Sequence, residues 1–144
     1  MRIAVLAFLT AITLAACSHP KPPAGKWEGT YESNDTMIAA RLEIAGGGQV
    51  RVSAPDLLDI GSAADEDRPA MRQKLAADLD AAWGDVAPRT MDFDGTIFRK
   101  PGGIAPQAIL KSGRMELVVY IGTQPGIHIA MRKVDEFSDD PWTQ

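Results

Sequence analysis

The sequence predicts an α+β fold, in which a mostly antiparallel, meandering sheet of about seven strands packs with one mid-chain helix at about residues 66–83. Apolar and polar residues alternate in short runs on both sides of residues 55–84, which is the period of half-buried strands. Between these runs the apolar residues recur at steps of four, which is the period of a helix. Strands joined mostly as neighbouring hairpins favour a strongly curved or barrel-like sheet.

The first 17 residues explain the single cysteine of the chain. Arg2 precedes an apolar run of about 14 residues, which suits the core of a signal peptide and is too short to span a bilayer. Leu14, Ala15 and Ala16 then precede Cys17, and this pattern resembles the lipobox of bacterial lipoproteins. The resemblance implies a signal peptide at residues 1–16, cleavage between Ala16 and Cys17, and membrane attachment through acyl chains on Cys17. The alternative is an ordinary secretory signal in which Cys17 is incidental.

Residues 17–25 are expected to be the lipidated cysteine and a tether. Pro20, Pro22 and Pro23 favour an extended, semi-rigid spacer that holds a domain away from the membrane. Ser18 follows the cysteine, and in the lipoprotein family a residue other than Asp at this place implies export to the outer membrane. The resemblance therefore implies a lipid-anchored, periplasm-facing protein of the outer membrane, with one folded domain at residues 26–137.

Three strands are expected before the helix, at residues 26–32, 36–44 and 49–53. The first contains Trp27 and Tyr31, which are residue types that favour strands. Three consecutive glycines at 46–48 connect the second and third runs, and a glycine-rich connection between two alternating runs predicts a hairpin.

The helix is predicted from a stripe of apolar side chains on one face, Met71, Leu75, Leu79 and Trp83. Acidic residues at 65–67 and Pro69 suit its N-terminus, and Gly84 suits its end. The stripe has two interpretations: it seals the concave side of the sheet as core, or it lines a pocket for an apolar ligand. The first interpretation is favoured, because the side chains of a small sheet nearly fill its interior.

Four more strands are expected after the helix, at residues 90–100, 104–110, 115–121 and 127–131. Asp94 and Gly95 interrupt the first of them with a tight turn or a bulge. Pro106 suits an edge position, because proline cannot donate a hydrogen bond to a neighbouring strand. Residues 138–144 form a polar tail, in which Trp142 has the potential to dock on the domain.

Composition restricts the function. The chain of 144 residues carries a net charge of −4, and only Arg2 is charged within residues 1–16. Removal of that segment leaves 128 residues, enough for one domain, with one further unit of negative charge. This balance argues against a nucleic-acid partner and against a polybasic membrane footprint. With Cys17 used for lipid, the domain has no disulfide and no thiol chemistry.

No enzymatic motif stands out. Residues 92–95 (Asp-Phe-Asp-Gly) resemble the start of a calcium loop, but Pro101 occupies the position that needs a bidentate glutamate, so a turn with solvated acids is expected. His128 alternates with Ile127 and Ile129 and is expected at the surface, without a second histidine to form a metal site. The sequence therefore predicts no enzyme activity, no metal and no cofactor.

A second resemblance concerns the mature domain. Gly25, Trp27, Gly29 and Tyr31 form a Gly-x-Trp opening that resembles the first strand of lipocalins and their calycin relatives. The resemblance implies that Trp27 closes the bottom of a barrel and packs against an arginine of a late strand. Arg132 is the candidate for this cation–π partner.

Two functions remain open at this point. The first is a non-enzymatic interaction module that contacts an envelope protein or a cell-wall component. The alternative is a lipocalin-like carrier of a small apolar ligand or lipid. A filled interior favours the first function, and the Gly-x-Trp opening favours the second.

Overall fold

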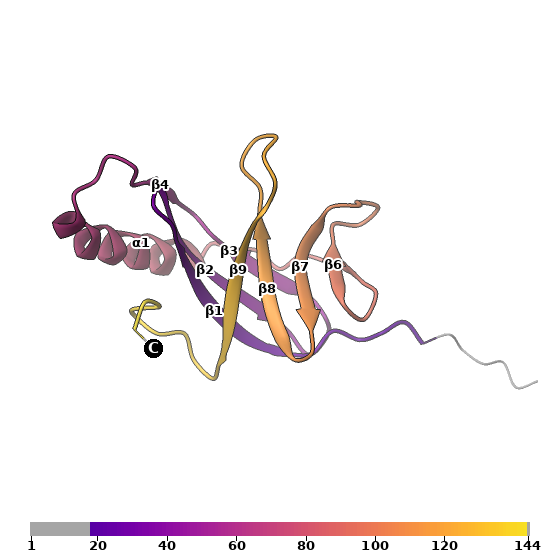
Figure 1. The fold of residues 1–144 in the computed structure, drawn as a ribbon. Coiled ribbons are helices and arrows are strands. Elements are labelled where there is room, and N and C mark those ends of the chain that lie inside the picture. The colour runs from indigo at the N-terminus through magenta and orange to yellow at the C-terminus, as the bar shows by residue number, and fades with distance from the viewer. Residues whose placement is uncertain (1–17, 144) are drawn as a thin grey trace, which may run out of the picture.

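The computed structural model describes residues 18–143, so the predicted cleavage site at Ala16 and Cys17 lies outside the described residues. The described chain forms one α-helix, one short 3-10 helix (Asp65–Asp67) and nine strands. The elements are β1 (Gly25–Glu32), β2 (Thr36–Ile44), β3 (Val50–Ser53), β4 (Leu57–Asp59), α1 (Arg68–Trp83), β5 (Asp92–Phe93), β6 (Ile97–Arg99), β7 (Pro106–Lys111), β8 (Arg114–Val119) and β9 (Ile127–Val134). The predicted α+β class with a curved antiparallel sheet is confirmed (Figure 1).

All nine strands belong to one antiparallel sheet, which curls into a half-barrel (Figure 1). The strand order is β3-β2-β1-β9-β8-β7-β6-β5, and β4 pairs with β2 beside this path. The two ends of the path, β3 and β5, approach each other without pairing as strands. A single bridge connects the two sides: Val50 of β3 and Arg89, which precedes β5, exchange two backbone hydrogen bonds of 2.8 Å. We call this incompletely closed side of the barrel the seam.

The sheet has more strands than the seven expected, for two local reasons. The predicted strand at 90–100 is divided into β5 and β6 by a turn, in which the Asp94 carboxylate accepts hydrogen bonds from the backbone N–H groups of Thr96 (2.9 Å) and Ile97 (2.8 Å). Gly95 in this turn has a φ of +100°, which glycine adopts without strain. The other additional strand, β4, is only three residues long and pairs with the start of β2.

The inner face of the half-barrel is filled by its own side chains. Alternate residues of β2 point inward and meet side chains of the late strands, because successive residues of a strand face opposite sides. This interior cluster comprises Trp27, Ile38, Ala40, Leu42, Ile44, Val50, Phe98, Ala108, Met115, Leu117, Ile129 and Met131.

The helix packs on the outer face of the sheet, and the expectation that it seals the concave side is wrong. The residues of β2 that point to the other face, Met37 and Ala39, form a second cluster with Leu75, Leu79 and Ile60, which we call the outer cluster. Leu79 is 0% exposed and Leu75 is 1% exposed, so both leucines are core. The β2 strand is therefore buried on both faces, between the interior cluster and α1.

The remaining two residues of the stripe lie at the margins of this outer cluster. Met71 is partly buried against it. Trp83 is half-buried and meets the ring of Phe137 edge-on, with the ring centroids 4.8 Å apart. The apolar stripe of α1 thus holds the helix and the C-terminal segment on the sheet.

Both ends of α1 are fixed by arginines. Pro69 lies in the first turn, as predicted, and the Arg68 and Arg72 side chains bind the Glu32 carboxylate at the end of β1. Although partial burial opposes it, these hydrogen bonds lower the pKa of Glu32. At the other end Arg51 donates to the carbonyl oxygen of Trp83 (2.7 Å), which also accepts a hydrogen bond from the backbone N–H of Val86 (3.3 Å).

The C-terminal segment returns to the outer face of the sheet. Trp142 joins the outer cluster, and its Nε1 donates a hydrogen bond of 3.2 Å to the carbonyl oxygen of Arg72. The polar tail is therefore docked through Trp142. Among residues 18–143, no helix has the length and apolar character needed to cross a membrane.

Candidate functional site

The half-barrel has two different ends. At the base, β1 begins and β7 turns into β8; at the mouth, β3 and β8 end and β9 begins. Trp27 closes the base, since it is only 4% exposed and belongs to the interior cluster. The Lys133 Nζ lies 5.5 Å from the centre of the Trp27 ring.

The expected contact between Trp27 and Arg132 is wrong. The register of β1 and β9 pairs Trp27 with Lys133 and pairs Glu28 with Arg132. Because neighbouring residues of a strand face opposite sides of the sheet, Arg132 points outward while Trp27 points inward. The cation over the indole ring is therefore Lys133, and Arg132 binds the Glu28 carboxylate at 2.6 Å.

The buried carboxylate of Glu28 belongs to a structural network. Glu28 is 1% exposed and accepts hydrogen bonds from Arg132, from the Ser138 hydroxyl (2.8 Å) and from the Ser138 backbone N–H (3.0 Å). The neighbouring Arg41 donates to the Ser138 carbonyl oxygen (3.0 Å) and to Asp80 (3.1 Å). Both carboxylate oxygens of Glu28 have hydrogen-bond partners within the chain, so this network holds the C-terminal segment in place and is not a candidate site.

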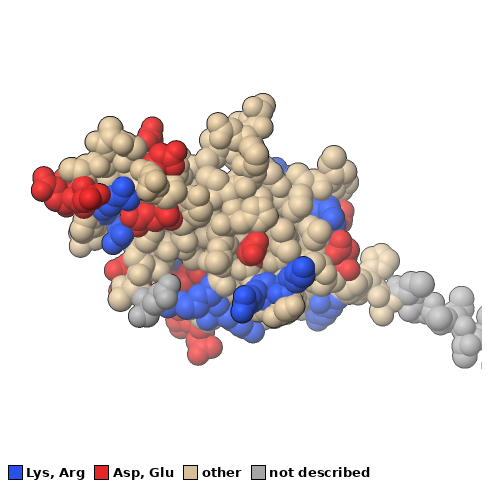
Figure 2. Space-filling model, viewed as in Figure 1, with Lys and Arg blue, Asp and Glu red and all other residues tan. Residues whose placement is uncertain are grey.

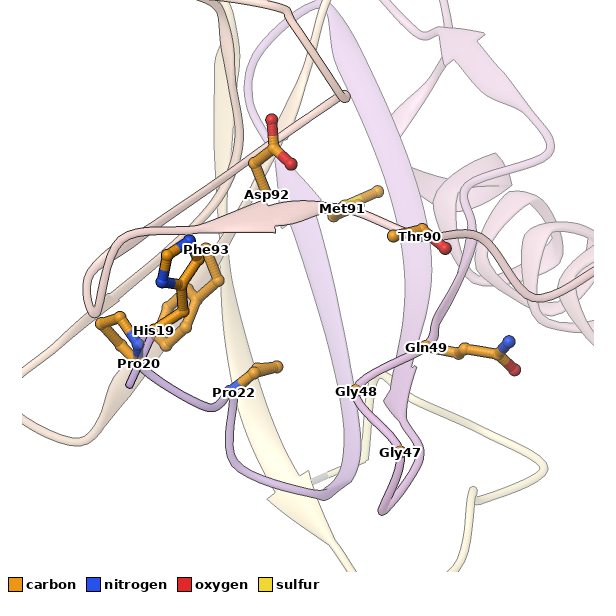
Figure 3. Close-up of a pocket in the computed structure, with 10 residues that line it drawn as sticks. All are labelled: His19, Pro20, Pro22, Gly47, Gly48, Gln49, Thr90, Met91, Asp92 and Phe93. Atoms are coloured by element: carbon orange, nitrogen blue, oxygen red, sulfur yellow. The ribbon is translucent and has the colours of Figure 1, made fainter. Parts of the chain in front are cut away.

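A first hollow, of about 540 Å³, lies along the seam on the side of the base (Figure 3). Three segments line it: His19 to Pro22 of the N-terminal segment, the turn at 47–49, and residues 90–93. Pro22 lies against the turn so closely that a Cβ on Gly48 would be 3.4 Å from its ring. The N-terminal segment thus lies across the seam, and the hollow is a gap between this segment and the sheet.

A second hollow, of about 270 Å³, opens at the mouth on the other side of the Val50–Arg89 bridge. Its walls are mostly apolar and come from β3, the segment before β5, and β8. The lining residues are Val52, Ala54, Arg89, Met91, Lys100, Gln107, Leu117, Val118, Val119 and Tyr120. Several of these residues are partly buried and pack against the interior cluster, so the interior cluster reaches solvent at this mouth hollow.

Two cations line the mouth hollow. Arg89 and Lys100 are both exposed, and among residues 18–143 we find no carboxylate in a salt bridge with either of them. Two cations without a carboxylate partner therefore stand beside an apolar wall. It suits a molecule that has an apolar part and a negative group.

Exposed apolar side chains surround the mouth. Ile104 is 91% exposed in the β6–β7 loop, and Tyr120 and Ile121 are about two-fifths exposed in the β8–β9 loop. The Tyr120 hydroxyl donates to the Pro106 carbonyl oxygen at 2.6 Å and thereby ties the two loops together. We call these three residues the rim.

The other sequence candidates are not brought together into a site. His128 is exposed, and its Nδ1 lies 2.9 Å from the Glu116 carboxylate. Asp92 accepts a hydrogen bond from the backbone N–H of Gly102. Asp94 serves the β5–β6 turn, where hydrogen bonds from Arg99 and from two backbone N–H groups lower its pKa to about 2. No group of three or more potential metal ligands occurs in the described part of the chain.

No family model, curated protein or solved structure matches this chain. The likeness of its N-terminus to a lipobox and of its first strand to lipocalins therefore remains a prediction.

Sequence reasoning missed the residues of the mouth. Arg89 follows the helix in an irregular segment, and Lys100 precedes a turn, so neither belongs to a recognisable pattern. They line the same hollow because the seam places the segment before β5 beside β3 and the β6–β7 connection. Both cations lie in loops, and no local pattern in the sequence brings them together.

Proposed function

We propose that the protein is a lipid-anchored, non-enzymatic binding module of the bacterial envelope, and that its mouth holds a small amphipathic anion. The observation that carries this proposal is the mouth hollow, in which Arg89 and Lys100 stand beside an apolar wall without a carboxylate partner in the described chain. An apolar chain would contact Met91 and Val119, and its carboxylate would meet the two cations.

The size of the hollow limits the ligand. Its volume of about 270 Å³ is near the lower limit of roughly 300–1,000 Å³ that is usual for small-molecule sites. The interior below it is occupied by Phe98, Met115 and other buried side chains. We therefore expect a short apolar chain or a single ring, bound at the end of the barrel and not along its axis.

The anchoring part of the proposal rests on Leu14 to Cys17 and the proline-rich segment that follows. Replacement of Cys17 by serine (C17S) tests it, because serine cannot form the thioether. We expect C17S to remain unprocessed or to be released into the periplasm, whereas the wild type fractionates with outer membranes. A C17S protein that is cleaved to mature size and still fractionates with membranes would contradict lipidation.

The rim favours a second candidate function. Ile104, Tyr120 and Ile121 expose apolar surface around the mouth, and the edges of β3 and β5 share one bridge only. Exposed apolar patches of this kind can mark protein contacts. Under this candidate the module would bind an envelope protein or a cell-wall component at its mouth, with no small ligand and no chemistry.

Calorimetric titration with octanoate and octanol distinguishes the two candidates. These probes share the apolar chain and differ in charge. With a form that begins at Ser18 and keeps both hydrophobic clusters, we expect octanoate to bind at least tenfold more tightly than octanol. The double variant Arg89→Gln and Lys100→Gln should remove this difference.

The matched control is Lys111→Gln with Arg114→Gln, which removes the same charge at the base. This control should keep the preference for octanoate. Equal binding of octanoate and octanol by the wild type, or equal losses in both double variants, would contradict the proposed anion site. If the folded wild type binds neither probe, the interaction module becomes the better explanation.

A further inference from the structure

Cations form a row across the outer face of the sheet near the base. The β7–β8 register pairs Lys111 with Arg114, and β8 and β9 are aligned so that Arg114 lies beside Arg132. Arg132 in turn is paired with Glu28 of β1. Lys133 follows on the inner side of the same end, over Trp27. Cross-strand neighbours on one face stand about 4.5–5.5 Å apart at their Cβ atoms, so the three outer cations form one contiguous surface, with Lys133 beside it on the inner side of the same end.

Much of this positive charge is not neutralised within the protein. Arg132 binds Glu28, and Lys26 binds Glu136, but Lys111, Arg114 and Lys133 take part in no salt bridge among residues 18–143. All three are exposed. We call Lys111, Arg114, Arg132 and Lys133 the basic row.

Acidic residues are most numerous around the helix. Figure 2 shows Lys and Arg gathered along the lower edge of this face, below β9, β8 and β7, with some Asp and Glu beside them, while a larger group of Asp and Glu surrounds α1. The acidic residues near the helix include Asp56, Asp65 and Asp78. The net charge of −4 thus conceals a group of cations along the lower edge of this face.

The N-terminal segment reaches the domain at the same end. Residues 18–24 approach the lower edge of the domain and enter β1 at Gly25 (Figure 1). A membrane anchor at Cys17 would therefore hold the base, and not the mouth, next to the bilayer.

We propose that the basic row binds the anionic headgroups of the membrane that carries the protein, and that the domain thereby stands with its base on the bilayer and its mouth pointing away. This inference rests on the proposed anchoring. A lipid surface suits the row better than a nucleic acid, because an anchor at Cys17, eight residues before β1, would keep the base at a high effective concentration of headgroups. The row also offers only three free cations, fewer than an untethered polyanion needs for stable binding at physiological salt.

The test uses the full chain reconstituted into vesicles of phosphatidylcholine, with or without phosphatidylglycerol. A membrane-impermeant amine-acylating reagent then labels the lysines, and mass spectrometry compares their rates. With phosphatidylglycerol at low salt, we expect the labelling of Lys111 and Lys133 to slow several-fold. Lys74 on α1 and Lys100 at the mouth should label equally fast in both vesicles, and high salt should remove the protection.

A charge reversal sharpens the test. Arg114→Glu should abolish the protection of Lys111 and Lys133, and the control Lys100→Glu, with the same change of charge at the mouth, should preserve it. Stable attachment to both vesicles with equal labelling of all four lysines would overturn the inference and leave the anchoring intact. A chain that associates with neither vesicle would overturn both.

Discussion

The base and the mouth of the half-barrel are built from the same strands, yet they differ in how completely they are closed. At the base, Trp27 is buried and Lys133 covers its ring. At the mouth, Val52 and Val119 are only partly buried and line a hollow with two free cations. At the base a large aromatic residue is buried in the interior cluster, whereas several side chains that line the mouth hollow are only partly buried.

This difference separates stability from binding. Side chains at the base are surrounded by others, so their loss leaves a cavity inside the protein. Side chains at the mouth already face solvent, so their loss changes a surface more than a core. Substitutions at the base should therefore change the free energy of unfolding, and substitutions at the mouth should change ligand affinity.

Trp27→Ala is expected to have the largest effect on stability. Deletion of a large buried aromatic side chain costs about 3–5 kcal/mol of unfolding free energy. Urea denaturation followed by circular dichroism measures it, with Tyr120→Ala at the mouth as the comparison. If Trp27→Ala unfolds at the same urea concentration as the wild type, the base does not depend on its tryptophan and the comparison fails.

Leu79→Ala tests whether the outer cluster acts on stability alone. Leu79 is fully buried between α1 and β2, so its truncation should cost roughly 2–5 kcal/mol. Because α1 lies on the face of β2 that points away from the interior, octanoate affinity should be unchanged under conditions where the variant is folded. A loss of affinity in the folded variant would mean that the helix stripe contributes to a ligand site after all.

Val52→Ala should show the reverse behaviour. Its partly buried side chain lines the mouth hollow, so we expect a cost of about 1 kcal/mol or less in stability. Octanoate binding should weaken measurably in calorimetry, because the shorter side chain removes apolar contacts from the lining of the mouth hollow. A large destabilisation with unchanged affinity would place Val52 in the structural core and weaken the distinction between the two ends.

The smallest expected effect concerns the pH dependence of the β5–β6 turn. Hydrogen bonds from Arg99 and the backbone lower the pKa of Asp94 from 3.8 to about 2. A carboxyl group whose pKa is lower in the folded state stabilises the protein above its unfolded pKa and loses this contribution as the pH falls through the folded value. The difference in stability between the wild type and Asp94→Asn should therefore shrink between about pH 4 and pH 2. A difference that stays constant over this range would exclude the charge of Asp94 as its cause.

Much of the fold follows from local patterns in the sequence. Alternation in residues 36–44 and 115–121 predicts strands that the structure contains as β2 and β8, of which β8 ends at Val119, and the glycines at 46–48 predict the hairpin between β2 and β3. The steps of four from Met71 to Trp83 predict α1 to within two residues at its start. These signals are local, since one face of each element must be apolar whatever lies opposite.

The remaining features depend on contacts between distant parts of the chain. The pairing of β1 with β9 decides that Lys133, and not Arg132, covers Trp27, and no pattern within either strand contains that register. The face of the sheet that receives α1 depends on which side of β2 is already occupied. Arg89 and Lys100 meet at the mouth only because the seam nearly closes, so the candidate site was beyond sequence reasoning.

The proposed anion site lies at the mouth, and not at the base or along the seam. A two-dimensional ¹H–¹⁵N spectrum of the protein titrated with octanoate locates the bound ligand. We expect saturable shifts of the backbone amides of Val52, Met91 and Val119, with the indole N–H of Trp27 unmoved. Shifts centred on Trp27 and Lys133 or on the turn at 47–49, or no saturable shifts at all, would contradict it.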